Sequence, residues 1–242
     1  SHMGIFATGQ TYEQLILHLL AHPLPEARDY GQMILDEVKA VMPSFVARVE
    51  RPERGGEWIG FLEERTRAGA RWAGRLGLEH SAGDGPSVRL VRHEGEEEDL
   101  LAALLFESAG SSETAMREAI DGLDSDERAA LLRDLVGRRA NRRHRPGRGL
   151  ETLRYRFEIV ADYGAFRDLQ RHRMLTVQWQ ALTPDLGAGV PEQVDQAGCG
   201  DAYRRALEVS AREYERLRDR GLVSAAPYAL CLGYRIRFIL DL

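Results

Sequence analysis

The chain has 242 residues, 43% of them apolar and 29% charged, and a formal net charge of -5. This length can bury a sizeable core in one large domain or two small ones. No apolar run approaches the roughly 20 residues of a membrane-spanning helix, and the acidic charge argues against a general nucleic-acid binder. We expect a globular, cytoplasmic protein without a membrane partner.

The first part of the chain is predicted to be helical. Ser1-His2-Met3 is typical of a cloning remnant, so the native start is unknown. Thr11 with Gln14 fits a capping box at the start of one helix, and a second helix is predicted over 26–41. A third follows the loop expected at 51–56. It carries aromatic residues that we expect in the core: Trp58, Phe61 and Trp72.

A strand and two further helices are predicted next. Residues 87–93 suit a short strand. The acidic run 94–99 favours a helix start, because negative charge complements the positive amino-terminal end of the helix dipole. Asp124 with Glu127 predicts the cap of a later helix.

A basic loop follows these helices. Six arginines fall within eleven positions: Arg138, Arg139, Arg142, Arg143, Arg145 and Arg148. With Tyr155 and Phe157 nearby, this density of guanidinium groups suits an RNA or single-strand contact surface. The acidic net charge and the inward alternation of these aromatics argue against nucleic acid. The loop equally suits pairing with acidic helices across a subunit interface, as a structural oligomerisation device.

A cationic triplet follows a strand and a short helix. Residues 153–159 alternate apolar and charged side chains, the period of a half-buried strand. A helical pattern then leads directly to Arg171-His172-Arg173 and a strand-like run. If the chain is extended here, Arg171 and Arg173 project to one side and can fork onto a phosphate or a ring carbonyl, with His172 turned the other way. Alternatively, the cations only complement the carboxyl end of the helix dipole.

The chain closes with a long helix over 200–220 and an alternating strand over 234–240. Strands scattered among long helices predict an α+β fold with an antiparallel sheet. We expect a mainly helical region over 4–86 and an α+β core over 87–242. The two cysteines lack a CxxC or metal-like spacing, so no disulfide or metal framework is expected. The sequence has no GxGxxG or GxxxxGK phosphate loop.

The triplet resembles the Arg-His-Arg signature of the flavin-dependent thymidylate synthase (ThyX) family. The resemblance begins at the basic loop, runs through Ala181 and continues more weakly into the last helix and strand. It implies FAD held between subunits of a homotetramer, and reductive methylation of dUMP to dTMP with methylenetetrahydrofolate as carbon donor and NADPH to reduce the flavin. By position it implies the flavin contacts Arg171, His172 and Arg173, and the candidate substrate-binding residues Arg167 and Gln178.

Several positions depart from the family pattern. Asp168 stands where the family has a glutamine, and Thr152 where it has a histidine. The family's nucleotide-binding Ser-Gly-Arg is replaced by Ala181-Leu182-Thr183, and the chain stops before the family's Asn-x-Arg helix. Flavin contacts are thus better preserved than substrate contacts.

These departures predict a divergent member, or one half of a duplicated chain, with a degenerate nucleotide site. We expect a homo-oligomer, either a tetramer or a pseudo-tetramer of duplicated halves. The alternative function is a non-catalytic oligomerisation or RNA-binding module that uses the basic loop.

Overall fold

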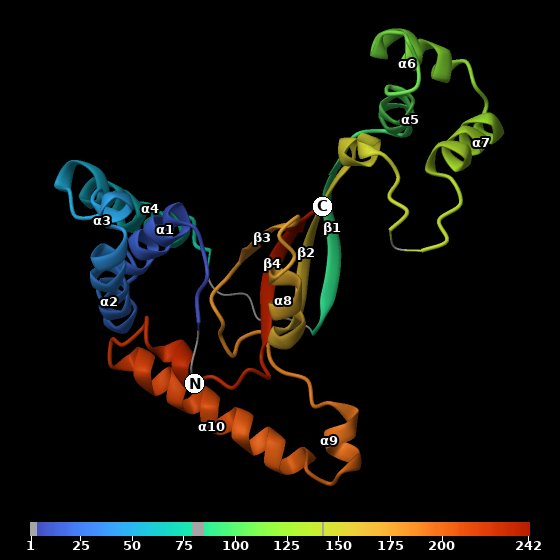
Figure 1. Ribbon diagram of the computed structural model, residues 1–242. Helices are drawn as coiled ribbons and strands as arrows, with labels where there is room; N and C mark the ends of the chain where they lie inside the picture. The colour runs from blue at the N-terminus through green and yellow to red at the C-terminus, as the bar shows by residue number, and fades with distance from the viewer. Residues whose placement is uncertain (1–3, 79–84, 142) are drawn as a thin grey trace. The chain divides into compact units, whose positions relative to one another are not determined.

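The computed structural model describes residues 4–78, 85–141 and 143–242. The chain divides into two compact units (Figure 1), one made of Ser1–Ser81 with Val209–Leu230 and the other of Ala82–Glu208 with Cys231–Leu242. The domain boundaries predicted from the sequence, 4–86 and 87–242, stay a prediction. Among the described residues, every helix is too short or too polar to cross a membrane.

The first unit is helical. Its elements are α1 (Gly9–Leu20), α2 (Pro25–Val41), α3 (Pro43–Val46), η1 (Pro52–Gly56), α4 (Glu57–Arg75) and η3 (Ala226–Ala229). The side chain of Thr8 caps α1 by accepting a hydrogen bond from the Thr11 N–H at 3.3 Å, so the cap is Thr8 and the prediction of Thr11 was wrong. A π-helical turn, η1, replaces the expected loop. Gly55 makes it possible, because its backbone approaches the Val49 carbonyl too closely for a Cβ.

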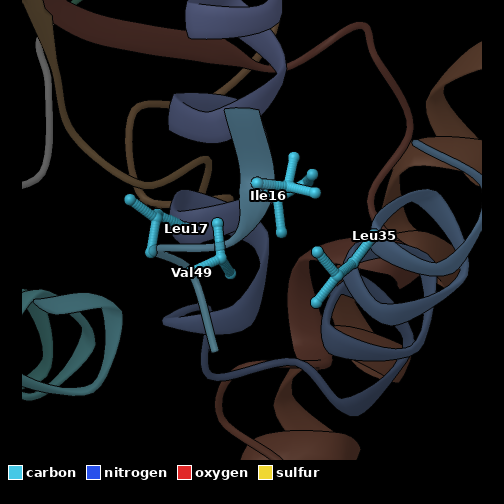
Figure 2. Close-up of a cluster of buried hydrophobic side chains, with 5 residues drawn as sticks. Ile16, Leu17, Leu35 and Val49 are labelled. Atoms are coloured by element: carbon cyan, nitrogen blue, oxygen red, sulfur yellow. The ribbon is translucent and has the colours of Figure 1, made fainter. Parts of the chain in front are cut away.

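A small apolar cluster forms the core of this unit. Figure 2 draws side chains of this cluster as sticks and labels Ile16, Leu17, Leu35 and Val49. The whole cluster is Ile16, Leu17, Leu35, Val46 and Val49. The expectation that the aromatics of α4 lie in the core was wrong, because Trp58, Phe61 and Trp72 are all exposed. The Arg75 guanidinium lies 4.8 Å from the centroid of the Trp72 ring. A cation–π contact therefore stabilises the exposed Trp72 ring.

The second unit is built on a four-stranded antiparallel sheet, which confirms the predicted α+β class. The strand order is β1-β2-β4-β3, with bounds Ser87–Glu94, Arg154–Asp162, Arg235–Asp241 and Thr176–Trp179 respectively. Burial along β4 alternates strictly, as the period of a strand predicts. Its buried residues Ile236 and Phe238 contact Phe166 of α8 (Tyr163–Gln170), which gives this face of the sheet a core.

A helical insertion separates β1 from β2 (Figure 1). It contains α5 (Glu97–Leu105), α6 (Glu113–Asp121), α7 (Ser125–Val136) and η2 (Arg148–Thr152). The predicted cap of α7 is confirmed, because Asp124 accepts from the Glu127 N–H at 2.9 Å and Glu127 accepts from the Asp124 N–H at 3.0 Å. The predicted helix start in the acidic run is also confirmed, at Glu97. One cluster of buried side chains in the insertion consists of Leu101, Ala102, Met116 and Ile120.

Two α-helices, together with η3, lie between β3 and β4 in the sequence. The short α9 (Glu192–Gln196) was not predicted, whereas the long α10 (Gly200–Asp219) was. Helix α10 begins in the second unit and ends in the first. Cys199 and Cys231 are exposed, and no disulfide joins them in the described part of the chain.

Candidate functional site

Helix α8 carries the cationic triplet at its carboxyl end. Asp162 caps the helix by accepting a hydrogen bond from the Ala165 N–H at 2.9 Å. Phe166 is 1% exposed, and its ring centroid lies 5.2 Å from that of Phe238 and 5.5 Å from that of Trp179. Aromatic pairs at this spacing add to the free energy of burial. Buried contacts therefore fix the end of α8, which falls at Gln170 as predicted.

The triplet itself forms a turn. Arg171 caps α8 with a right-handed helical backbone, the His172 N–H donates to the Leu169 carbonyl at 3.0 Å, and the Leu175 N–H donates to the His172 carbonyl at 3.1 Å. The strand begins only at Thr176. The expectation of an extended segment at the triplet was wrong, because these hydrogen bonds continue the helix end into a turn. Arg171 and Arg173 therefore do not share a strand face.

The side chains of the triplet are exposed. Arg171 forms an ion pair with Asp168, with 75% and 72% of the two side chains exposed. Such a pair is worth about 0–1 kcal/mol, so an anionic ligand can compete for the guanidinium. His172 and Arg173 are also exposed, and no side-chain hydrogen bond or ion pair joins either of them to another described residue. The turn thus offers its cationic groups outward.

A cavity of about 610 Å³ adjoins the chain just after the triplet. The residues that line it come from β1, η2, β2, the segment that enters β3, and the end of the chain: Arg92, Glu94, Leu150, Glu151, Leu153, Arg154, Arg156, Met174, Leu175, Thr176, Asp241 and Leu242. Its volume lies within the range of roughly 300–1,000 Å³ that is usual for small-molecule sites.

Three strands meet in a polar network at the cavity wall. Arg156 of β2 donates to Asp241 of β4 at 2.5 Å and to the side-chain oxygen of Gln178 of β3 at 3.1 Å. The strand register places Arg156 opposite Asp241, which accounts for the pair. Gln178, a predicted substrate-binding residue, does not line the cavity but is hydrogen-bonded to a residue that does.

Charges of both signs line the cavity. Arg92 pairs with Glu94 at 2.9 Å, and Arg148 pairs with Glu151 at 2.8 Å. The hydrogen bond from Arg148, followed by its positive charge, lowers the pKa of the Glu151 carboxyl. Arg154 differs from these arginines, because no side-chain hydrogen bond or ion pair connects it to the rest of the described chain. Its guanidinium is available to an anion in the cavity.

The remaining predicted residues lie elsewhere. Arg167 is exposed on α8, and Arg143 and Arg145 are exposed in the basic loop. Arg148 pairs with Glu151, which lines the cavity, and Arg142 lies outside the described residues. In the described segments, no three His, Cys, Asp or Glu side chains gather as a metal site requires.

Sequence reasoning missed the arginines of the sheet. Arg92, Arg154 and Arg156 line the cavity together with Asp241, although none was predicted as a site residue. A signal was present, because charged residues alternate with apolar ones in β2 and β4, and alternate residues share a face. The register that joins the strands could not be read from the chain alone.

Comparison with known proteins identifies the family. The family model described as "Thymidylate synthase complementing protein" (Thy1) matches residues 89–242, which include β2, β3, β4, α8, the triplet and all of β1 except its first two residues. A UPF0159 protein of Chlamydia muridarum (strain MoPn / Nigg) is 30% identical over 99% of this chain and 45% of its own length. UPF0159 protein Ta1429 of Thermoplasma acidophilum is 27% identical over 97% of this chain and 46% of its own length. The chain thus spans less than half the length of these relatives.

A solved structure has a similar fold. The UMP/dUMP methylase PolB from Streptomyces cacaoi, bound with 5-Br dUMP, aligns with a TM-score of 0.50 and 20% identity over 67% of this chain and 74% of its own. Together with the match over the sheet and the triplet, this likeness in fold confirms the resemblance indicated by the Arg-His-Arg signature. The chain belongs to the thymidylate synthase complementing protein family.

Proposed function

We propose that the chain is a flavin-dependent nucleotide methylase of the thymidylate synthase type, with dUMP as substrate. The observation that carries this proposal is the exposed triplet next to an arginine-lined cavity, both within the segment that matches the family. The similarity in fold to a UMP/dUMP methylase is consistent with a pyrimidine nucleotide as substrate.

The residues at the cavity fit FAD. Guanidinium groups bind phosphate oxygens through paired, charge-assisted hydrogen bonds, and Arg154 and Arg173 have donors to spare. Leu153 and Leu175 add apolar surface suited to a flat ring system. We assign the diphosphate to these arginines, and the triplet residues Arg171 and His172 to neighbouring contacts.

The proposed reaction is a reductive methylation. C5 of dUMP gains a methyl group whose carbon comes from methylenetetrahydrofolate, and the hydrogen at C5 leaves as a proton. When bound, FAD carries the electron pair from NADPH that reduces the transferred carbon. The chain's own contribution is to orient the anionic groups through its arginines, because positioning converts a bimolecular encounter into an effectively unimolecular step.

A second polypeptide segment completes the nucleotide site in this proposal. Ala181-Leu182-Thr183 replaces the family's Ser-Gly-Arg and so lacks both a hydroxyl at the first position and a phosphate-binding guanidinium. Each lost contact costs on the order of 1–3 kcal/mol in a ligand site. Because the curated relatives are about twice as long as this chain, the missing groups are assigned to another half or to another copy in a homo-oligomer.

Flavin binding tests the proposal directly. Titration of FAD with the protein, followed by flavin fluorescence, is expected to show saturable binding. Arg173→Ala and Arg154→Ala should each weaken it by about tenfold or more, because a hydrogen bond to a charged group is worth about 1.5–3 kcal/mol. Arg216→Ala is the matched control, because Arg216 is an exposed arginine of α10 paired with Glu213. Its affinity for FAD should match that of the unaltered protein.

Release of label from C5 of labelled dUMP, with methylenetetrahydrofolate and NADPH present, tests the chemistry separately. Release that depends on FAD supports a methylase. FAD binding without release would remove the catalytic claim and leave a flavin-binding protein. Absence of FAD binding would remove the whole proposal.

A further inference from the structure

The helical insertion contains a second cavity, distinct from the one beside the triplet. It measures about 550 Å³ and lies between the carboxyl end of α7 and the segment that returns to η2. Its lining, which we name the α7 groove, consists of Leu100, Leu132, Arg133, Val136, Gly137, Arg138, Arg139, Pro146 and Leu150. Of these, only Leu150 is shared with the first cavity.

The α7 groove combines an apolar floor with a cationic rim. Leucine, valine and proline side chains form the floor, and Arg133, Arg138 and Arg139 supply the charge. Within the described part of the chain, no carboxylate lines the groove or pairs with these three arginines. By contrast, many of the chain's other arginines are paired with carboxylates, as Arg117 and Arg128 are within the same insertion. The positive charge of the rim is therefore uncompensated.

The groove is held in shape before any partner arrives. Gly149 of η2 lies so close to α5 that a Cβ would meet the Leu104 nitrogen at 2.7 Å. The loop that carries the rim is braced internally, because Arg139 Nε donates to the His144 carbonyl at 2.7 Å and the Ala140 N–H donates to His144 Nδ1 at 3.2 Å. A preformed site loses less conformational entropy on binding.

We propose that the α7 groove binds an acidic amphipathic helix of a partner protein. Apolar side chains of such a helix, spaced at i, i+3 or i+4 and i+7, would occupy the floor, as in other helix-in-groove complexes. Carboxylates flanking them would pair with the arginines of the rim. RNA fits less well, because sequence-tolerant binding of single strands relies on aromatic side chains for stacking and the groove has none.

Fluorescence anisotropy with designed probes tests the proposal. The probe is a fluorescein-labelled helical peptide with leucines on one face and glutamates on the other. Two comparison probes are the same peptide with lysine for each glutamate and a fluorescein-labelled oligouridine. The glutamate peptide should bind, and its affinity should exceed that of the lysine peptide by about tenfold or more, because like charges at an interface are strongly disfavoured.

Charge reversal locates the binding. Arg138→Glu with Arg139→Glu should weaken the glutamate peptide about tenfold or more, and Leu150→Ser about fivefold, because one removes the rim's charge and the other part of the apolar floor. Arg143→Glu with Arg145→Glu is the matched control: it makes the same charge change in the same loop, outside the groove. This control should alter the affinity by less than about threefold.

Several results would overturn the inference. Equal losses in the two charge-reversed variants would indicate general electrostatic attraction, and tighter binding of oligouridine would indicate a nucleic-acid surface. Self-association abolished by Arg138→Glu with Arg139→Glu, measured by sedimentation, would assign the groove to a second copy. Circular dichroism of each variant checks its fold, and Arg138→Gln with Arg139→Gln replaces a variant that does not fold. This inference is independent of FAD binding, so failure of the inference leaves the proposed function unaffected.

Discussion

The two faces of the four-stranded sheet differ in burial and in charge. On one face, which we call the closed face, Ile236 and Phe238 are buried against Phe166 of α8. On the other, which we call the open face, Arg156 and Asp241 pair across strands while about a third of each side chain stays exposed. The first face fixes where α8 ends and hence where the triplet lies. The second keeps charged groups accessible, as a ligand site requires.

The largest expected effect concerns the closed face. Phe238→Ala should destabilise the fold by about 3–5 kcal/mol, because it removes a buried aromatic side chain and leaves a cavity between β4 and α8. Chemical denaturation would measure the loss. Leu232→Ala serves as the control, since Leu232 is 67% exposed and should change stability by less than about 0.5 kcal/mol. A similar small loss at Phe238 would erase the contrast between the faces.

The open face should depend less on any one side chain. Asp241→Asn removes the charge that accepts from Arg156 and should cost about 1–2 kcal/mol, because the pair is only partly buried. A double-mutant cycle with Arg156→Gln isolates the coupling between the two groups. Coupling below about 0.3 kcal/mol would mean that this face contributes little to stability.

Lowering the pH should weaken the ion pair between Arg148 and Glu151 at the cavity wall. Since the hydrogen bond and charge of Arg148 lower the pKa of Glu151 in the folded protein, the pair's contribution to stability is fully present above the pKa of Glu151 in the unfolded chain. It is lost as the pH falls through the lowered folded value. NMR titration of the Glu151 carboxyl should show its pKa rising toward the ordinary value in Arg148→Ala. The substitution Arg145→Ala should leave the pKa of Glu151 unchanged. A shift of this pKa in Arg145→Ala would indicate that the charge of the whole basic loop, and not the Arg148 contact, lowers it.

Local signals in the sequence were sufficient for much of the fold. The strands β2 and β4 and the reciprocal cap of Asp124 with Glu127 follow from patterns among neighbouring residues, so they could be predicted. The triplet was found by its spacing and its family resemblance. The turn that it forms was missed, because the hydrogen bond from the Leu175 N–H to the His172 carbonyl joins backbone atoms and is not indicated by the residue types.

Features that depend on distant pairing could not be read from the chain. Arg156 and Asp241 are 85 positions apart and meet only through the β2–β4 register. The exposure of Trp58 and Trp72 was missed for a related reason, since helical spacing shows which residues share a face but not whether another element covers that face. In this chain, the cavity wall and the uncovered aromatics both follow from tertiary arrangement.

The smallest expected effect on stability is at the triplet. Asp168→Asn removes the carboxylate that pairs with Arg171 and should change the free energy of unfolding by about 0.5 kcal/mol or less, because both side chains are mostly in water. The same substitution releases the Arg171 guanidinium, so the affinity for FAD should rise, measurably at low salt and less at high salt. Glu213→Gln gives a matched loss of one carboxylate from an exposed arginine pair, and it should alter neither quantity. If Asp168→Asn weakens FAD binding instead, the carboxylate itself positions the triplet, and the ion pair belongs to the site rather than competing with it.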